Sequence, residues 1–184
     1  MIFVVRRVRP DEWERVRDLR LDAVRDPAAS IAFLYTYEQE AAHPDSFWRE
    51  RTNRASAGDA AAQFIAELDD QWIGSLSVIR GGASASGGEQ TGFSSSNVVG
   101  VYVRPQHRGR GVIDALFQAA ADWARSTGCD RLTLDVHTDN AQAQGAYRRL
   151  GFEPTGHRFT GPIGSELQMA RSLGSRDDSG RVQS

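Results

Sequence analysis

The amino-acid sequence predicts a three-layer α/β domain, in which helices flank a central mixed and mostly antiparallel sheet. The chain has 184 residues, enough for one domain with a real core and too few for a full second one. Strands and helices are expected in the order β-α-α-β-β-β-α-β-α-β-β, so they alternate only in the second half. This order argues against a doubly wound parallel sheet. We expect the domain to span residues 1–171 and residues 172–184 to form a disordered tail.

The N-terminal part begins with a strand and continues with helices. The apolar run in Ile2–Val8 predicts the strand. Apolar residues at helical spacing then predict an amphipathic helix over Asp11–Arg25, which Asp26-Pro27 ends. These apolar residues are Trp13, Val16, Leu19 and Val24. The segment Ile31–Arg54 is rich in aromatic residues, and we expect short helices there with a break near Pro44.

The middle of the chain has the pattern of a hairpin followed by a buried strand. Gln63–Leu68 and Trp72–Ile79 flank the turn residues Asp69-Asp70, as in a β-hairpin. Gly81–Ser96 is rich in glycine and serine and is longer than the usual loop. It is either a floppy hairpin loop, which loop statistics favour, or a functional lid. Asn97–Val103 is apolar, β-branched and uncharged, which is typical of a buried strand.

The second half of the sequence alternates helices with strands. A helix is expected over Gly111–Ser126, and its apolar face is formed by Ile113, Leu116, Ala120 and Trp123. Alternating apolar and polar residues predict a strand over Leu132–His137. A further helix is expected over Ala141–Leu150, ended by a glycine. Phe152–Phe159 and Glu166–Ala170 are expected to be the last two strands.

The overall charge and the polar residue pattern exclude several classes of function. The formal net charge is -2, so the composition favours neither nucleic acid nor an anionic membrane as a partner. A single cysteine, Cys129, cannot form an internal disulfide, and a reducing cytoplasm is the expected compartment. No apolar run approaches the ~20 residues that span a bilayer. The four histidines have no metal-ligand spacing, so we predict no metal.

The stretch Gln106–Val112, between a predicted strand and a predicted helix, has the features of an anion-binding loop. A helix N-terminus offers unpaired N–H groups and the positive end of the macrodipole. Gly109 and Gly111 allow a ligand to come close to the backbone. Basic side chains gather here, and they are Arg104, His107, Arg108 and Arg110. The alternative is a glycine-eased turn with solvated arginines.

Two well-known phosphate-binding motifs do not match the sequence of this loop. The Walker loop needs a Lys-Ser/Thr pair that is absent here. The dinucleotide fingerprint needs a third glycine where this sequence has Asp114. The pattern Val103-x-Pro105-x-x-Arg108-Gly-x-Gly111-Val112 instead resembles the acetyl-coenzyme A loop of the GNAT family, the GCN5-related N-acetyltransferases. Many family members have a small residue where this chain has Ile113.

The resemblance implies a cofactor and the residues that hold it. Acetyl-coenzyme A (acetyl-CoA) would be the co-substrate, with no metal. Backbone amides would bind its pyrophosphate, and they belong to Arg108, Gly109, Arg110, Gly111, Val112 and Ile113. The strand residues Val101, Tyr102 and Val103 would bind the pantetheine arm, and the Val101 N–H would polarise the thioester carbonyl.

A second motif, Asn140-x-x-Ala143-x-x-x-Tyr147-x-x-x-Gly151-Phe152, resembles the same family in the expected order. The resemblance implies that Asn140 contacts coenzyme A near the pantetheine arm and that the Tyr147 hydroxyl faces the sulfur. A phenol there can donate a proton as the thiolate leaves. Asn140 as a plain helix cap and Tyr147 as a core aromatic remain alternatives. Gly145 is unfavourable in a helix and either tolerates strain or permits close approach.

The general base is left open by the sequence. Asn97 stands where many family members have Glu, and an amide cannot accept the proton of the amine. Other candidates are Asp135, His137, Glu38 and Glu40. We therefore expect an N-acetyltransferase that transfers acetyl to an amine of a small-molecule or peptide acceptor by direct attack in a ternary complex.

Two alternatives remain, and the acceptor side is the least legible part of the chain. One is a catalytically silent acyl-CoA-binding or sensor module on the same fold, which the neutral Asn97 favours. The other, disfavoured by the net charge, is a nucleic-acid-binding protein that uses the arginine cluster. Exposed aromatic residues between Phe33 and Trp48 are expected to suit a homodimer face.

Overall fold

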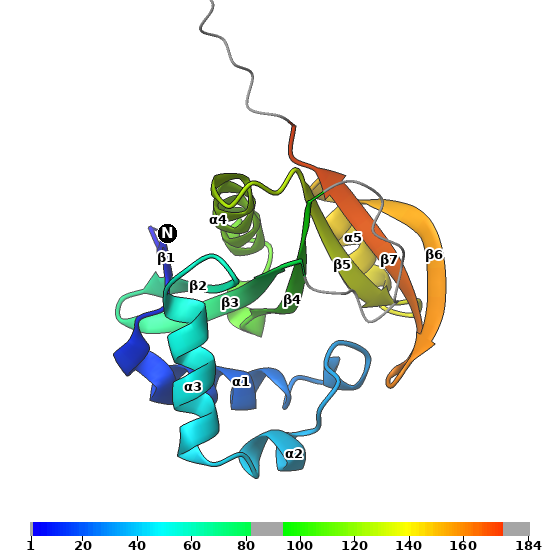
Figure 1. Cartoon of the computed structure of the whole chain (residues 1–184). Helices are drawn as coiled ribbons and strands as arrows, with labels where there is room; N and C mark the ends of the chain where they lie inside the picture. The colour runs from blue at the N-terminus through cyan, green and yellow to red at the C-terminus, as the bar shows by residue number, and fades with distance from the viewer. Residues whose placement is uncertain (1, 82–93, 175–184) are drawn as a thin grey trace, which may run out of the picture.

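The computed structural model describes residues 2–81 and 94–174, and these form one seven-stranded sheet with helices on both sides (Figure 1). The strands are β1 Val4–Arg7, β2 Ala61–Leu68, β3 Gln71–Arg80, β4 Ser95–Val103, β5 Arg131–His137, β6 Glu153–Gly161 and β7 Gly164–Ser172. The helices are α1 Trp13–Ala23, α2 Tyr37–Ala41, α3 Asp45–Ser56, α4 Val112–Ser126 and α5 Ala141–Arg149. Short 3-10 turns are η1 Pro10–Glu12, η2 Ala29–Ile31 and η3 Pro105–His107.

The sheet is mixed and mostly antiparallel, as the sequence predicts. Its strand order is β1-β2-β3-β4-β5-β7-β6. Within the described part of the chain, β4 and β5 are the parallel pair and every other neighbouring pair is antiparallel. The hairpin turn between β2 and β3 is formed by Asp69 and Asp70, both with positive φ. Aspartate tolerates this left-handed conformation better than most residues, so the turn agrees with the sequence-based expectation.

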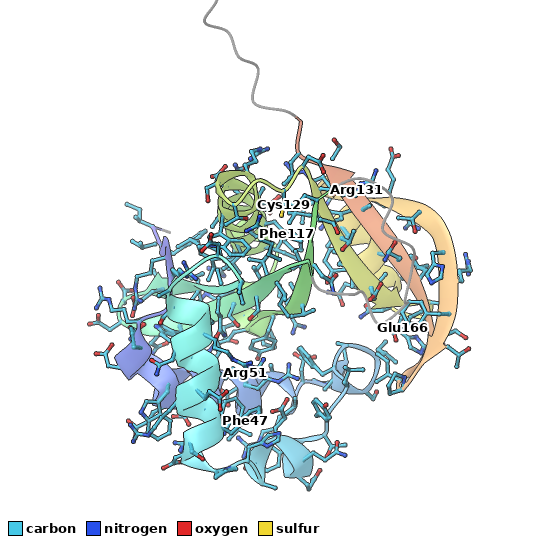
Figure 2. The ribbon with its side chains drawn as sticks, viewed as in Figure 1. Phe47, Arg51, Phe117, Cys129, Arg131 and Glu166 are labelled. Atoms are coloured by element: carbon cyan, nitrogen blue, oxygen red, sulfur yellow. The ribbon has the colours of Figure 1, made fainter. Side chains whose placement is uncertain are left out.

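Two buried clusters, one on each face of the sheet, make the domain three-layered. On one face, α4 packs its apolar stripe, centred on Leu116 and Phe117, against the central strands. On the other face, α1 and α3 cover the first strands, and Trp48 of α3 is fully buried there beside Ile65 of β2. Figure 2 shows Phe117 on the α4 side of the sheet, and α3 on the other side. No helix among the described residues is long and apolar enough to cross a membrane.

Most predicted elements are present, with boundaries that move by at most two residues. β1 is shorter than the expected Ile2–Val8. β7 continues to Ser172 and Leu173 is buried, so the folded part extends past residue 171. The hydrophobic contact of Leu173 is the physical reason. Residues 175–184 of the expected tail, and residues 82–93 of the glycine- and serine-rich segment, lie outside the described residues.

The aromatic residues between Phe33 and Trp48, which were expected to be exposed, are exposed only in part. Phe33 is 8% exposed and Trp48 is 0% exposed, because both rings fill the core beneath α1. Tyr35, between them, is 51% exposed, and the neighbouring Leu34 is exposed to a similar extent. The helices here are short, so no long periodic pattern distinguished the buried rings from exposed ones. A homodimer at this face stays a prediction.

Candidate active site

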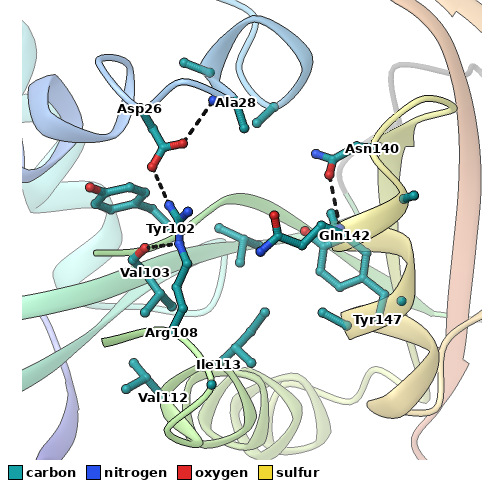
Figure 3. A pocket seen from close by; sticks show the side chains of 18 of the residues that line it. Asp26, Ala28, Tyr102, Val103, Arg108, Val112, Ile113, Asn140, Gln142 and Tyr147 are labelled. Atoms are coloured by element: carbon teal, nitrogen blue, oxygen red, sulfur yellow. Dashed lines mark hydrogen bonds and ion pairs between the residues drawn. The ribbon is translucent and has the colours of Figure 1, made fainter. Parts of the chain in front are cut away.

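The two parallel strands β4 and β5 separate soon after they meet. They pair only over Ser95–Asn97 of β4, although β4 continues to Val103 and β5 to His137. Gly100 has φ +63, and the pairing of β4 with β3 shifts register close to it, between Ser75 and Ser77 of β3. A cavity of about 390 Å³ opens at this divergence, between β4, α4 and α5 (Figure 3).

The backbone of β4 turns unpaired groups toward the cavity. The N–H of Arg104 donates to the Ile73 carbonyl of β3 at 2.9 Å. Backbone groups alternate sides along a strand, so the N–H groups of Val101 and Val103 face away from β3. The Val103 carbonyl, on that same outward side, accepts a hydrogen bond from Nε of Arg108 at 3.0 Å. Val101 and Val103 therefore offer N–H donors where β5 no longer pairs.

The N-terminus of α4 has no side-chain cap. Its N-cap residue is Gly111, with φ 78, and no side chain accepts from the first turn. The first helical hydrogen bond is donated by Ala115 to Gly111, so the N–H groups before Ala115 have no acceptor within the helix. Gly109 and Gly111 both have positive φ, and a Cβ at either would meet nothing within 4 Å. The backbone is thus open to a phosphate.

Arg108 is held in place by an acidic residue that the sequence analysis did not identify. Its guanidinium forms an ion pair with Asp26, which follows α1 in the chain. The other carboxylate oxygen of Asp26 accepts the N–H of Ala28 at 3.0 Å. Both Asp26 and Arg108 line the cavity. In the sequence, Asp26-Pro27 was interpreted only as a helix end, and no local pattern indicates its long-range partner.

Most predicted site residues line this cavity. They are Val101, Tyr102, Val103, Arg108, Gly109, Val112, Ile113, Asn140 and Tyr147. Arg110 and Gly111 do not line it, although Gly111 begins α4. Lining residues that the sequence analysis missed are Asp26, Ala28, Ala29, Ala32, Phe33 and Gln142. Most of these come from the irregular segment after α1, where the sequence offers no periodicity.

Asn140 both caps α5 and ties it to the segment after α1. Its Oδ1 accepts the N–H of Ala143 at 3.1 Å, so its role as a helix cap is present. Its Nδ2 donates to the Ile31 carbonyl at 3.5 Å, a long hydrogen bond. Asn140 therefore bridges two sides of the cavity, and a ligand contact would replace or share the weaker of these bonds.

Tyr147 is a buried tyrosine that points from α5 into the cavity (Figure 3). Its ring packs against Phe117 at a centroid distance of 5.7 Å and against Phe152 at 6.2 Å. Burial raises the pKa of the Tyr147 phenol to about 12. A neutral phenol is therefore maintained at physiological pH, which is the protonation state that a proton donor needs.

The candidate bases named from the sequence do not line the cavity. Asn97 accepts a hydrogen bond from the Thr133 hydroxyl at 3.3 Å. Nδ1 of His137 accepts the N–H of Asp139 at 3.1 Å, so the proton of neutral His137 sits on Nε2. Glu40 is buried in an ion pair with Arg20, whereas Glu38 is exposed on α2. These contacts show that His137 and Glu40 have structural roles in the fold.

Comparisons with known proteins agree with this arrangement. The sequence pattern of the Acetyltransferase (GNAT) family matches residues 13–152. Aminoglycoside N(6')-acetyltransferase type 1 of Salmonella typhimurium is 33% identical over 116 residues, covering 61% of this chain and 77% of that enzyme. Several other curated relatives are matched over less than two thirds of their own length.

Solved structures show the same fold. A GNAT-family acetyltransferase from Streptococcus pneumoniae has a TM-score of 0.74, with 14% identity, over 94% of this chain and 100% of that chain. The PaiA N-acetyltransferase of Thermoplasma acidophilum, solved in complex with coenzyme A, has a TM-score of 0.65, with 16% identity, over 94% of this chain and 99% of that one. Together with the family match over residues 13–152, these findings show that the chain belongs to the acetyltransferase (GNAT) family of acyltransferases.

Proposed function

We propose that this protein is an N-acetyltransferase that transfers the acetyl group of acetyl-CoA to an amine by direct attack within a ternary complex. One observation carries the proposal. A single cavity of about 390 Å³ is bounded both by the first residues of α4, whose N-terminus lacks a side-chain cap, and by the neutral phenol of Tyr147 on α5. Phosphate-binding and proton-donating groups are thus presented to one elongated ligand.

The walls of the cavity suit the cofactor. Backbone N–H groups from Arg108 to Ile113 would hold the pyrophosphate, because they surround the uncapped end of α4. The outward N–H groups of Val101 and Val103 would extend the strand ladder to the amide groups of the pantetheine arm. The amide of Asn140 would hold the same arm from α5, in exchange for its long hydrogen bond to Ile31.

The chemistry requires little more than positioning and one proton donor. Acetyl-CoA, when bound, supplies an activated acyl group, and transfer forms a C–N bond while the C–S bond breaks. The Val101 N–H would donate to the carbonyl oxygen as negative charge develops there. Tyr147 would give its phenolic proton, or a hydrogen bond, to the departing sulfur. Holding both reactants in one site can supply a large share of the rate, on the order of 7–11 kcal/mol.

The proton of the acceptor amine leaves by a route that does not use a carboxylate at position 97. Asn97 is neutral at every pH, but its amide and the Thr133 hydroxyl can hold a water molecule. A free alkylamine with a pKa near ~10.4 is mostly protonated at pH 7. The reaction rate at low acceptor concentration should therefore rise with pH, as the neutral fraction of the amine rises.

The acceptor class we propose is a small-molecule or peptide amine. The similar Salmonella enzyme is named for an aminoglycoside acceptor, and another relative is named for a ribosomal-protein alanine. The cavity itself carries few acceptor-specific features. Aminoglycosides, polyamines, amino acids and peptide N-termini therefore belong in one panel.

The test combines cofactor binding with turnover. Calorimetry should show coenzyme A binding, and thiol release from acetyl-CoA should depend on an amine from the panel. The chain contains no lysine, so its own side chains add no alkylamine background. Binding of coenzyme A without turnover on any amine would indicate a silent acyl-CoA-binding module. Absence of coenzyme A binding would refute the proposal outright.

A further inference from the structure

A second, smaller cavity lies on the opposite face of the sheet from α4. It is enclosed by α1, α3 and the strands β2, β3 and β4, and its volume is about 20 Å³. Figure 2 shows Arg51, which lines it, on α3 where this helix passes α1. Its polar lining consists of Arg20, Arg51, Gln63, Ser75, Ser77 and Tyr102. A cavity of this polarity between two layers of core calls for an explanation.

Positive charge is in excess around this cavity. Arg20 donates to Glu40 at 2.7 Å, and Glu40 is 1% exposed. Arg51 is half-buried and, within the described parts of the chain, forms no ion pair. The three charges therefore leave one guanidinium uncompensated. Burial, and next the charge of Arg20, lower the pKa of Arg51 below its usual range. An anion placed here would offset both the burial of the Arg51 charge and its repulsion by Arg20.

Two further polar atoms at the cavity lack partners. The indole N–H of Trp48 and Oε1 of Gln63 are buried and make no hydrogen bond within the described part of the chain. Trp48 is 0% exposed and Gln63 is 7% exposed. Buried polar atoms are paired in the great majority of cases, so unpaired ones that line a cavity indicate a polar occupant. The tryptophan N–H is a donor only, as are both guanidinium groups, and donors suit an anion. Oε1 of Gln63 is an acceptor, so the Gln63 amide must turn over to present its NH2 group to an anion.

The second cavity adjoins the place where acyl transfer is proposed. Tyr102 lines both cavities. Gly100 lines the smaller one and directly precedes Val101, which lines the larger one. The Arg20 guanidinium also stacks on Phe33, 4.5 Å from the ring centroid, and Phe33 lines the larger cavity. A group held by the arginines would therefore lie beside the wall that the two cavities share.

We propose that Arg20 and Arg51 bind a carboxylate of the acceptor, so that the substrate is an amine that also carries a carboxylate, such as an amino acid. This inference rests on the proposed N-acetyltransferase function. A planar carboxylate matches the fork of a guanidinium with two parallel hydrogen bonds. The present volume suffices for about one water molecule. The long side chain of Arg51 must therefore swing outward as the carboxylate enters.

The test compares each L-amino acid with its carboxamide. The two share the amine and the side chain, but the α-amine of the amide resembles that of a peptide, with a pKa near ~8, and is more neutral at pH 7.5. Chemistry alone therefore favours the amide. We expect kcat/KM for the best amino acid to exceed that of its amide by at least tenfold. In Arg51→Gln this ratio should fall below one, because the more neutral amine of the amide then decides the preference.

Two control variants separate charge recognition from folding. Arg54→Gln lies on the same helix, is exposed and does not line the cavity, so it should keep the wild-type ratio. Arg51→Lys keeps the charge and should keep part of the preference. Thermal melting of each variant shows whether it is folded. If the wild-type protein acetylates an amino acid and its amide equally, or if Arg51→Gln lowers both equally, the inference is wrong.

A binding measurement keeps the inference testable without turnover. N-acetyl amino acids are titrated into the wild-type protein and Arg51→Gln in the presence of coenzyme A, alongside N-acetyl amino acid amides. Binding of the acids alone, lost in Arg51→Gln, supports the carboxylate site even if no amine is acetylated. In that case the proposed catalytic function fails and the anion site stands. If the acids and the amides bind equally, or if neither binds, the proposed carboxylate site is wrong.

Discussion

The guanidinium of Arg108, in the loop before α4, is ion-paired with the carboxylate of Asp26, which follows α1. Both residues line the cavity proposed for acetyl-CoA. The ion pair fixes Arg108 before any ligand arrives. It also neutralises a positive charge, on Arg108, that would otherwise attract a phosphate.

Removing the charge of Asp26 should therefore strengthen coenzyme A binding. In Asp26→Asn, the amide oxygen can still accept the Ala28 N–H, while Arg108 becomes available to the pyrophosphate. A partly exposed pair of this kind is worth ~0.5–1 kcal/mol, so the Kd should fall about two- to fivefold. Calorimetry at low salt measures it, and the gain should shrink at high salt.

The neighbouring pair of Asp22 with Arg104 provides a matched control. Its atoms lie 2.7 Å apart, and neither residue lines the cavity. Asp22→Asn should leave the Kd of coenzyme A unchanged. If Asp26→Asn binds coenzyme A no better than Asp22→Asn does, Arg108 has no part in phosphate binding.

Tyr147→Phe should lower kcat and spare cofactor binding. The ring contacts with Phe117 and Phe152 remain in the variant, so the fold and the cavity wall are kept. Only the proton donor disappears, and loss of a general acid typically costs on the order of 10²-fold. Steady-state thiol release measures kcat, and calorimetry measures the Kd of coenzyme A. Tyr37→Phe, on α2 and outside both cavities, is the control. Unchanged kcat in Tyr147→Phe would remove Tyr147 from the chemistry.

Local sequence patterns were sufficient for the elements around the proposed cofactor loop. Gly109 and Gly111, followed by an apolar helical stripe, define a loop that enters a helix, and the structure has that helix without a side-chain cap. The alternation in Leu132–His137 predicted a strand, and the structure has β5 there. Each of these features depends on residues close together in the chain. Periodicity and cap preference report such features directly.

The contacts between segments far apart in the sequence could not be predicted in the same way. Asp26 meets Arg108 across 82 positions of sequence, and Asn140 meets Ile31 across 109. Arg51 sits on a helix whose polar and apolar residues were too mixed to assign a buried face. Such contacts arise only when α1 and α3 dock on the sheet. A single sequence contains no signal for which of its many arginines will end there.

The buried phenol of Tyr147 should make stability fall at alkaline pH. Its pKa is about 12 in the folded protein, against the ordinary value of 10.0 for an exposed tyrosine. The contribution of the neutral phenol is fully present below pH 10 and is lost as pH rises from 10 to 12, because the unfolded chain releases its proton first. The loss is ~1.4 kcal/mol by pH 11.

Urea unfolding at pH 9 and pH 11 measures this loss, and Tyr147→Phe should show a smaller decrease. Burial also raises the pKa of Tyr102, so the variant retains part of the alkaline decrease. The chain contains no lysine, so no amine side chain titrates in the same range. Equal decreases in the wild-type protein and Tyr147→Phe would show that the phenol is not buried as described.

Gly111→Ala should separate the backbone requirement of the loop from that of the fold. A left-handed conformation costs a residue with a Cβ about 1–2 kcal/mol. Gly128, near the other end of α4, also has positive φ and open space around its missing Cβ. Gly111→Ala and Gly128→Ala should therefore lose similar free energies of unfolding. Only Gly111→Ala should weaken coenzyme A binding, by at least fivefold. The reason is that the N–H groups at the start of α4 would face the pyrophosphate of coenzyme A. Equal Kd values in the two variants would contradict phosphate binding at this helix end.

Gly145→Ala should raise stability and weaken cofactor binding together. Gly145 lies within α5 and lines the cavity, and a Cβ there would meet only Arg149 of the described protein atoms, at 3.9 Å. No protein contact therefore requires glycine, and alanine favours a helix interior by ~1 kcal/mol. If the ligand packs against this bare backbone, the new methyl group must displace it, and the KM for acetyl-CoA should rise. Urea unfolding and steady-state kinetics measure the two effects. A variant that is more stable with unchanged KM would mean that Gly145 is tolerated strain and that the ligand does not approach α5 there.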